Sequence, residues 1–182
     1  MRKRILCRKI CIIGAESTGT TTLAKALAEH YMTNWVPEYG RGYYEAKMYR
    51  HDANEWVTEE FIRIAKEQKK MENLLAKTAN KVLICDTDPF ATSIWHERYM
   101  GFRSPEVEKI SENIKYDLYL LTNTDIPFVQ DGTRDGEHIR QWMHETFIKR
   151  LSETNKKFAI LSESHESRLS KALALINPII YG

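Results

Sequence analysis

The stretch Gly14-Ala-Glu-Ser-Thr-Gly-Thr-Thr21 combines residue types that can hold phosphate groups. Gly14 and Gly19 stand at the spacing of the phosphate-binding loop G-x-x-x-x-G-K-[ST], and the match fails only at the lysine, where Thr20 stands. Glycines let backbone N–H groups turn inward around a polyphosphate, and a following helix adds the positive end of its dipole. The stretch therefore predicts a site for the phosphates of a nucleotide.

Two residues near this loop are candidates for a metal ion. Thr21 is placed for its hydroxyl to ligate Mg²⁺ between the phosphates, and Asp86, after an apolar run, is placed to hold the ion directly or through a water. The alternative role of Asp86 is a helix N-cap. The sequence thus predicts ATP and Mg²⁺ as cofactors. The expected nucleotide contacts of the loop are Gly14, Glu16, Ser17, Thr18, Gly19, Thr20, Thr21 and Thr22.

The residue at position 20 separates this loop from the full pattern. The lysine normally places a positive charge on the β and γ phosphates, and loss of one such aligned group costs on the order of a hundredfold or more in rate. Thr20 cannot replace that charge. Either the protein binds nucleotide without rapid turnover, or another cation serves the phosphates, the candidates being Lys9, Lys25, Arg41 and Arg134.

Charged residues also follow the predicted second and third strands. Glu38 and Arg41 follow Trp35–Pro37, and Asp88 follows shortly after Lys81–Cys85. Because kinases use a carboxylate to accept or orient the proton of the attacking hydroxyl, we expect Glu38 or Asp88 to be the base. The alternative for Glu38 is an ordinary surface acid. The residues expected to contact the phosphoryl acceptor are Glu38, Tyr39, Arg41 and Asp88.

A polar, turn-rich stretch at Pro127–Gly136 carries Arg134, and Arg140 follows one turn into the next predicted helix. We expect residues 126–140 to form a lid that excludes water. In this lid Arg134 is predicted to be catalytic by neutralising charge on the transferring group, and Arg140 to contact the nucleotide. The alternative is that both arginines form surface ion pairs with nearby acids, namely Asp131, Asp135 and Glu137.

The elements that position these residues follow from hydrophobic periodicity. Short apolar runs predict strands at residues 10–13, 35–37, 81–85, 116–122 and 158–161. Helical spacing predicts helices at residues 21–31, at about 54–79 and from Pro89, whereas Gly40 and Gly42 are expected to stop any regular element after the second strand. This alternation indicates a three-layer α/β P-loop fold with a mainly parallel sheet of about five strands, a lid segment and a ligand crevice at the carboxyl ends of the strands.

Composition limits the classes of protein that remain. A chain of 182 residues with 42% hydrophobic and 29% charged residues fits one folded domain, residues 1–182. A net charge of +2 is too small to favour a nucleic-acid groove or an anionic membrane surface. Cys7, Cys11 and Cys85 lack CxxC spacing and are expected to be reduced. Without a signal peptide or an apolar run of roughly 18 residues, we expect a cytoplasmic protein, for which a homo-oligomer stays open.

Four motifs in order resemble one known family: Gly14–Leu23, Val36–Arg41, Asp86–Ser93 and Pro127–Arg134. They look like the ribosylnicotinamide kinase domain of NadR-type proteins. The resemblance implies transfer of the ATP γ-phosphate to the 5′-hydroxyl of nicotinamide riboside, a small-molecule partner. NadR-type proteins often also carry a nucleotidyltransferase domain, and we expect only the kinase part here because the first strand starts near residue 9.

Two alternatives remain beside that activity. The near alternative is a kinase of another nucleoside or nucleotide with a related fold. The alternative from a different class is a noncatalytic ATP-binding sensor or regulatory protein, which the threonine at position 20 favours.

Overall fold

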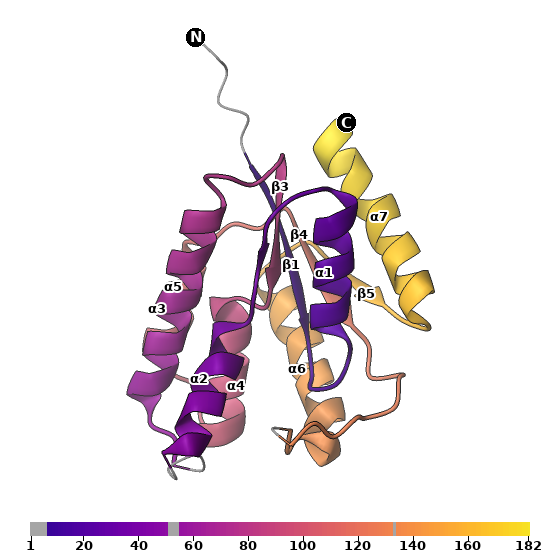
Figure 1. Ribbon diagram of the computed structural model, residues 1–182. Helices are drawn as coiled ribbons and strands as arrows, with labels where there is room; N and C mark the ends of the chain where they lie inside the picture. Colours follow the sequence, from indigo (N-terminus) through magenta and orange to yellow (C-terminus); the bar gives the residue numbers. More distant parts are fainter. Residues whose placement is uncertain (1–6, 51–54, 133) are drawn as a thin grey trace.

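The computed structural model describes residues 7–50, 55–132 and 134–182. Within these residues the centre is a sheet of five parallel strands in the order β2-β3-β1-β4-β5 (Figure 1). The strands are β1 (Arg8–Gly14), β2 (Trp35–Val36), β3 (Val82–Asp86), β4 (Leu118–Thr122) and β5 (Phe158–Leu161). The α/β fold and the parallel sheet predicted from the sequence are confirmed.

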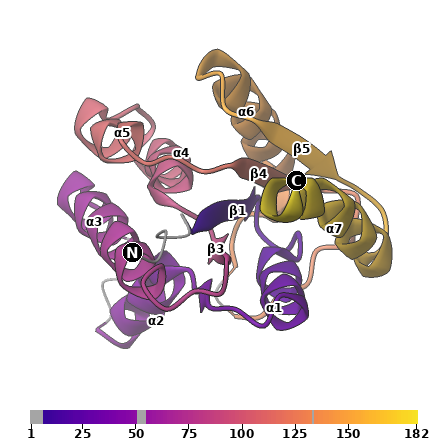
Figure 2. The same ribbon diagram turned by 90° about the horizontal axis from the view of Figure 1, so that it is seen from above.

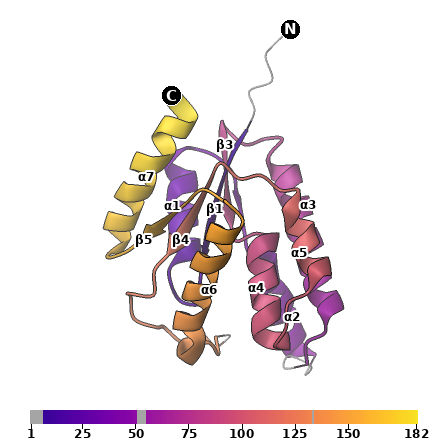
Figure 3. The same cartoon turned by 180° about the vertical axis from the view of Figure 1, so that it is seen from behind.

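Helices cover both faces of the sheet and make three layers. The helices are α1 (Thr20–His30), α2 (Tyr39–Tyr49), α3 (Thr58–Leu75), α4 (Pro89–Met100), α5 (Pro105–Glu112), α6 (Arg140–Glu153) and α7 (His165–Tyr181). A 3₁₀ turn at Glu137–Ile139 precedes α6. Helices α1 and α7 pack on one face, whereas α4 and α6 pack on the other, which faces the viewer in Figure 3 (Figures 2 and 3). Among the described helices, none is both long enough and apolar enough to cross a membrane.

The central strand β1 shows why this chain forms a buried parallel sheet. Ile10 and Ile12 pack toward α1 and α7, and Cys11 and Ile13 pack toward α4 and α6. Both faces of this parallel strand are covered by helices, so residues 10–13 are apolar at every position rather than at alternate positions. Cys11 and the neighbouring Cys85 are buried free thiols, as expected. The strand thereby fixes where its last residue, Gly14, leads into the loop.

The segment after β2 corrects the sequence analysis. Gly40 and Gly42 were expected to stop regular structure, but both lie inside helix α2. A glycine in a helix costs roughly 1 kcal/mol relative to alanine, and contacts with the next helix offset that cost. A Cβ atom on Gly40 would lie 3.4 Å from Ile64 of α3, so glycine lets the two helices approach closely. The predicted start of the long helix near residue 54 lies outside the described residues, and α3 begins at Thr58.

Gly14 is the residue at which a single methyl group has the largest predicted effect. Its added Cβ would lie 2.1 Å from Thr122 Oγ1 and 2.5 Å from Thr18 Oγ1, both on buried side chains. Gly14→Ala should therefore lower the free energy of unfolding by about 1–3 kcal/mol in a urea titration. The matched control is Gly42→Ala, where nothing lies within 4 Å and helix propensity should add about 0.5–1 kcal/mol. Equal stabilities of Gly14→Ala and the unaltered chain would contradict this geometry.

Candidate active site

The loop between β1 and α1 is closed by its own hydrogen bonds. Thr18 Oγ1 donates to the carbonyl oxygen of Ala15 at 2.7 Å and lies 2.7 Å from Thr122 Oγ1 on β4. The backbone takes left-handed conformations at Ser17, with φ of 57°, and at Gly19, with φ of 80°. Only glycine adopts such a φ without cost, which accounts for Gly19 at the start of α1. The spacing of the motif thus produces a tight turn ahead of a helix N-terminus.

Two buried arginines hold this loop from behind. Arg168 Nη1 donates to the carbonyl oxygen of Thr18 at 2.6 Å, and Arg140 Nη2 donates to that of Ser17 at 3.3 Å. Because the carbonyl groups of the turn point toward these arginines, its amide N–H groups point the other way, into the loop. Anion binding requires this orientation of the N–H groups. The expectation that Arg140 contacts the nucleotide is corrected, because Arg140 does not line the cavity. Arg168 was missed, since nothing distinguishes it from other polar residues of an amphipathic helix.

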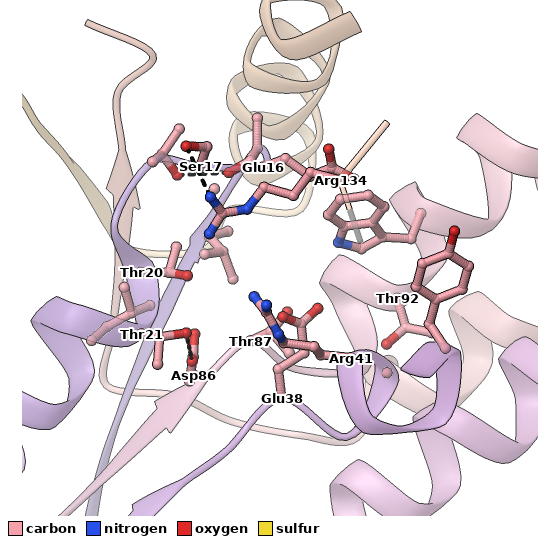
Figure 4. A pocket seen from close by; sticks show the side chains of 18 of the residues that line it. Glu16, Ser17, Thr20, Thr21, Glu38, Arg41, Asp86, Thr87, Thr92 and Arg134 are labelled. Atoms are coloured by element: carbon pink, nitrogen blue, oxygen red, sulfur yellow. Dashed lines mark hydrogen bonds between the residues drawn. The ribbon is translucent and has the colours of Figure 1, made fainter. Parts of the chain in front are cut away.

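A cavity of about 550 Å³ opens at the carboxyl ends of the strands, where the sequence analysis placed the ligand crevice. This volume is in the range of small-molecule sites. The phosphate-binding loop forms one end, and α2, the end of β3, α4 and the lid surround the rest (Figure 4). The predicted residues that line it are Gly14, Glu16, Ser17, Thr18, Gly19, Thr20, Thr21, Thr22, Glu38, Arg41, Asp86 and Arg134.

Two predicted acceptor contacts, Asp88 and Tyr39, are not brought to the cavity. Asp88 is fully buried, and its carboxylate accepts from Ala91 N–H at 2.8 Å and from the Tyr119 hydroxyl at 2.8 Å. Its oxygens therefore cap α4 and join that helix to β4. Tyr39 donates its backbone N–H to Gln68 Oε1 at 2.9 Å, which fixes the start of α2. We therefore assign neither residue a contact with the acceptor.

Thr21 and Asp86 meet at the phosphate end of the cavity. Thr21 Oγ1 donates to Asp86 Oδ2 at 2.5 Å (Figure 4). Asp86 Oδ1 is buried and has no hydrogen-bond partner within the described part of the chain, and burial raises the pKa of this carboxyl group. Because Asp88 caps α4, the N-cap alternative for Asp86 is excluded. An unpartnered carboxylate oxygen beside a threonine hydroxyl suits a hard cation such as Mg²⁺, which takes its other oxygens from phosphate and water.

Glu38 lies between the Thr21–Asp86 pair and the rest of the cavity (Figure 4). Burial and, to a smaller extent, the negative charge of Asp86 raise the pKa of Glu38 to about 8, while the positive charge of Arg41 opposes the shift. A carboxylate with a pKa near the working pH is suited to accept a proton from a hydroxyl group. Of the two acids predicted as the base, the structure brings Glu38 alone to the cavity.

The end of the cavity away from the loop is lined by an aromatic cluster. Tyr44 stacks on Trp56 with ring centroids 5.9 Å apart, and Trp56 lies 5.3 Å from Tyr99. Aromatic faces of this kind are a platform for a flat ring. The sequence did not single out Trp56, which falls inside the helix predicted at about residues 54–79 and lies just before α3. The cluster comprises Tyr44, Trp56, Phe61, Trp95 and Tyr99.

The predicted lid lies against the phosphate-binding loop. Val129 N–H donates to Ser17 Oγ at 2.8 Å, and Gly136 N–H donates to Glu16 Oε2 at 2.7 Å. The other oxygen of Glu16 accepts from Arg98 Nη1 at 2.8 Å, a contact that the sequence did not indicate. The carboxylate of Glu16 therefore joins the loop to the lid and to α4. Residue 133, inside the predicted lid, lies outside the described residues.

Comparison with known proteins agrees with this geometry. Residues 9–168 match the model of AAA_28, an AAA domain. The chain belongs to the AAA_28 family.

This AAA_28 domain is also similar to NadR proteins. It is 28% identical to the trifunctional NAD biosynthesis/regulator protein NadR of Escherichia coli strain K12, over 98% of this chain and 44% of that protein. The chain therefore spans less than half the length of this relative. A solved structure of NadR protein in complex with NR matches with a TM-score of 0.82 at 22% identity, over 96% of this chain and 52% of that one. The resemblance to NadR-type proteins is confirmed.

The fold extends to nucleoside kinases. A deoxyadenosine kinase from M. mycoides matches with a TM-score of 0.64 at 12% identity, over 94% of this chain and 99% of that chain. At this identity the likeness shows the fold alone, which is that of a P-loop kinase.

The raised pKa of Glu38 predicts how the stability of this AAA_28 domain depends on pH. The carboxyl group ionises near 4.5 in the unfolded chain and near 8 in the folded one, so the folded state binds more protons between these values. Stability should fall as pH rises through this window, and the loss should be complete above it. Glu38→Gln removes the effect, so its melting temperature should rise relative to the unaltered chain between pH 5 and 9, by several °C as an order of magnitude.

The matched control is Glu59→Gln, which removes an exposed acid at the start of α3. Its difference in melting temperature from the unaltered chain should stay flat over the same pH range. If the melting temperatures of Glu38→Gln and of the unaltered chain change with pH in the same way, the folded structure does not raise the pKa of Glu38.

Proposed function

We propose that this domain transfers the γ-phosphate of ATP to the 5′-hydroxyl of nicotinamide riboside and so makes nicotinamide mononucleotide. The observation that carries the proposal is a single cavity with a phosphate-binding loop at one end and an aromatic cluster at the other, with Glu38 between them. The P-loop kinase fold and the likeness to a NadR protein solved with NR support the same reaction.

On the nucleotide side, the backbone of Gly14–Gly19 and the N-terminus of α1 bind the phosphates. Thr21 and Asp86 hold Mg²⁺, whose charge, once the ion is bound, offsets the negative charge of the phosphates. The unpartnered Asp86 Oδ1 and the adjoining Thr21 hydroxyl support this assignment. With the phosphates bound in this way, the γ-phosphate of ATP points toward the rest of the cavity.

On the acceptor side, the aromatic cluster suits the nicotinamide ring. This ring is flat and carries a positive charge on its quaternary nitrogen, and aromatic faces attract both features. Trp56 is central to the cluster because it contacts Tyr44 and Tyr99 as well as Phe61. A ring held there directs the ribose of the same molecule toward Glu38 and the loop.

In the transfer step the 5′-oxygen forms a bond to the γ-phosphorus, and the bond from that phosphorus to the β,γ-bridging oxygen breaks to release ADP. Glu38 accepts the proton of the 5′-hydroxyl. Its pKa of about 8 leaves a fraction ionised at neutral pH and lets it accept that proton readily. Arg41 lines the cavity next to Glu38, where its positive charge lowers the pKa of that carboxyl group (Figure 4).

A second candidate function is a noncatalytic ATP-binding sensor. Thr20 favours it, because the loop lacks the lysine that normally assists transfer. A sensor of this kind binds ATP and shows no acceptor-dependent turnover, whereas a kinase releases many ADP per protein when the acceptor is present. A kinase of another nucleoside differs from the proposal only in which acceptor supports that release.

The assay that tests the proposal combines the purified chain with ATP, Mg²⁺ and nicotinamide riboside and follows the mononucleotide by chromatography. We expect multiple turnovers, with a kcat/KM at least about tenfold higher than for adenosine, cytidine or uridine, because none of these carries a ring cation. Glu38→Gln should lower kcat by on the order of a hundredfold, whereas Glu59→Gln should not change it. No mononucleotide above the protein-free blank would refute the proposal, and a faster uncharged nucleoside would reassign the acceptor.

The metal assignment predicts a specific change on Asp86→Asn. Loss of the carboxylate should raise the Mg²⁺ concentration for half-maximal activity by about tenfold or more, since an amide is a weaker ligand than a carboxylate. Asp117→Asn is the matched control, because Asp117 binds Arg8 and the backbone of Lys9 at the opposite end of β1. An unchanged magnesium titration for Asp86→Asn would contradict the assignment.

A further inference from the structure

The loop that binds phosphate lacks its usual positive side chain. Thr20 lines the cavity as the first residue of α1, and its hydroxyl is neutral. The β and γ phosphates of ATP bring several negative charges into a partly buried site that already contains Asp86 and Glu38. Helix dipole and metal ion offset part of this charge. The position that the lysine normally occupies still calls for a cation from elsewhere in the fold.

Among the described residues that line the cavity, the cations are Lys25, Arg41 and Arg134. Lys9, a further candidate from the sequence, lies near the start of β1, at the opposite end of that strand from Gly14. Its Nζ atom is 3.3 Å from Glu72 Oε2, a fully buried carboxylate. Lys9 is thereby excluded.

Lys25 and Arg41 face other partners. Lys25 is exposed where it lines the cavity, and its amino group lies over the Trp35 ring, 5.2 Å from its centroid. Arg41 projects from α2 beside Glu38, on the acceptor side of the cavity, and is 3.1 Å from Glu45 Oε1 (Figure 4). Neither contact brings a positive charge to the phosphate-binding loop itself.

Arg134 is the cation that touches the loop. Its Nη1 atom lies 3.3 Å from Ser17 Oγ, the middle of the turn between the two glycines, and also donates to the carbonyl oxygen of Val129. Figure 4 shows the guanidinium reaching from the lid across the loop on the side of Thr20. Because Val129 and Gly136 bind Ser17 and Glu16, the segment that carries Arg134 is fastened to two successive loop residues, one on each side of it.

An internal anion already marks where a phosphate would bind. Asp131 Oδ2 lies 3.3 Å from Arg134 Nε and 2.6 Å from Arg41 Nη2, so one carboxylate oxygen is shared by both arginines inside the cavity. Guanidinium groups pair with carboxylate and phosphate oxygens through the same N–H donors. A phosphate that enters can take over these donors without a large movement of either side chain.

We propose that Arg134 replaces the missing P-loop lysine and binds the β and γ phosphates of ATP from the lid. The proposal deepens the proposed function, because it rests on ATP binding at the same loop, but it does not depend on which acceptor is used. The positive charge beside the loop is thus supplied by a residue of the lid rather than by a residue in the first turn of α1.

The test compares ATP binding by variants that remove the positive charge at position 134 and variants that add a positive charge at position 20. Arg134→Gln should weaken binding of Mg²⁺-ATP by about tenfold or more in calorimetry and leave AMP binding unchanged, because AMP lacks the β and γ phosphates. Thr20→Lys in the same chain should restore ATP affinity to within about threefold. Arg134→Lys, which keeps the charge, should lose less than Arg134→Gln. Arg103→Gln, which removes an exposed arginine bound to Glu108, is the matched control and should bind ATP normally.

Two outcomes would overturn the proposal. In the first, Thr20→Lys does not restore ATP binding when it is combined with Arg134→Gln, but it does restore binding when combined with Lys25→Gln or with Arg41→Gln. That result would assign the role of the missing lysine to Lys25 or to Arg41. The other is full ATP affinity in Arg134→Gln. Since the titration contains no acceptor, it succeeds or fails separately from the riboside assay. Restored ATP binding without any mononucleotide would uphold the role of Arg134 and refute the proposed reaction.

Discussion

The arrangement depends on a contact between two threonine hydroxyls at the end of the central strand. Thr18 Oγ1 and Thr122 Oγ1 lie 2.7 Å apart, so one hydroxyl donates to the other, and Thr122 Oγ1 also lies 3.2 Å from the carbonyl oxygen of Ile13. These bonds join the phosphate-binding loop to β1 and β4 at once, over a Gly14 that has no room for a side chain. Buried, fully paired hydroxyls of this kind fix one geometry, because any other leaves a polar group unsatisfied. The loop, the start of α1 and the cavity follow from that geometry.

Charge is the second constraint on the site. Asp86 and Glu38 lie in one cavity, and burial raises the pKa of both carboxyl groups. Such a site favours a cation beside Asp86, and it favours the protonated form of Glu38, which is the form that Glu38 takes after it accepts a proton from a hydroxyl group. Arg41 and Arg134 line the same cavity and share Asp131. The cavity therefore combines carboxylates that suit a cation with arginines that suit an anion, which are the two features that ATP with Mg²⁺ requires.

The strands and the phosphate end of the site could be predicted from sequence because their signals are local. Apolar runs predicted all of the described strands, and β5 matches residues 158–161 at both ends. The glycine spacing placed the loop residues in the cavity. Helix α5 was missed, although Ser104 before Pro105 is a recognisable helix start.

The remaining site residues could not be predicted because their roles depend on distant contacts. Asp86 and Asp88 differ by two positions, and only the fold shows that the second is taken up by Tyr119 and Ala91. Gly40 and Gly42 read locally as helix breakers, yet packing of α2 on α3 overrides that preference. Arg168 reaches Thr18 across 150 positions of sequence, a pairing that no spacing rule contains.

The central claim is that one cavity holds a nucleotide and a riboside at the same time, phosphates at the loop and ring at the aromatic cluster. Calorimetric titration of Mg²⁺-AMP-PNP into the chain, with and without saturating nicotinamide riboside, tests it most directly. The account predicts one nucleotide bound per chain in both cases, with an affinity that the riboside leaves unchanged or raises. Loss of nucleotide binding as the riboside saturates would show that the two ligands compete for one position, and would contradict the account.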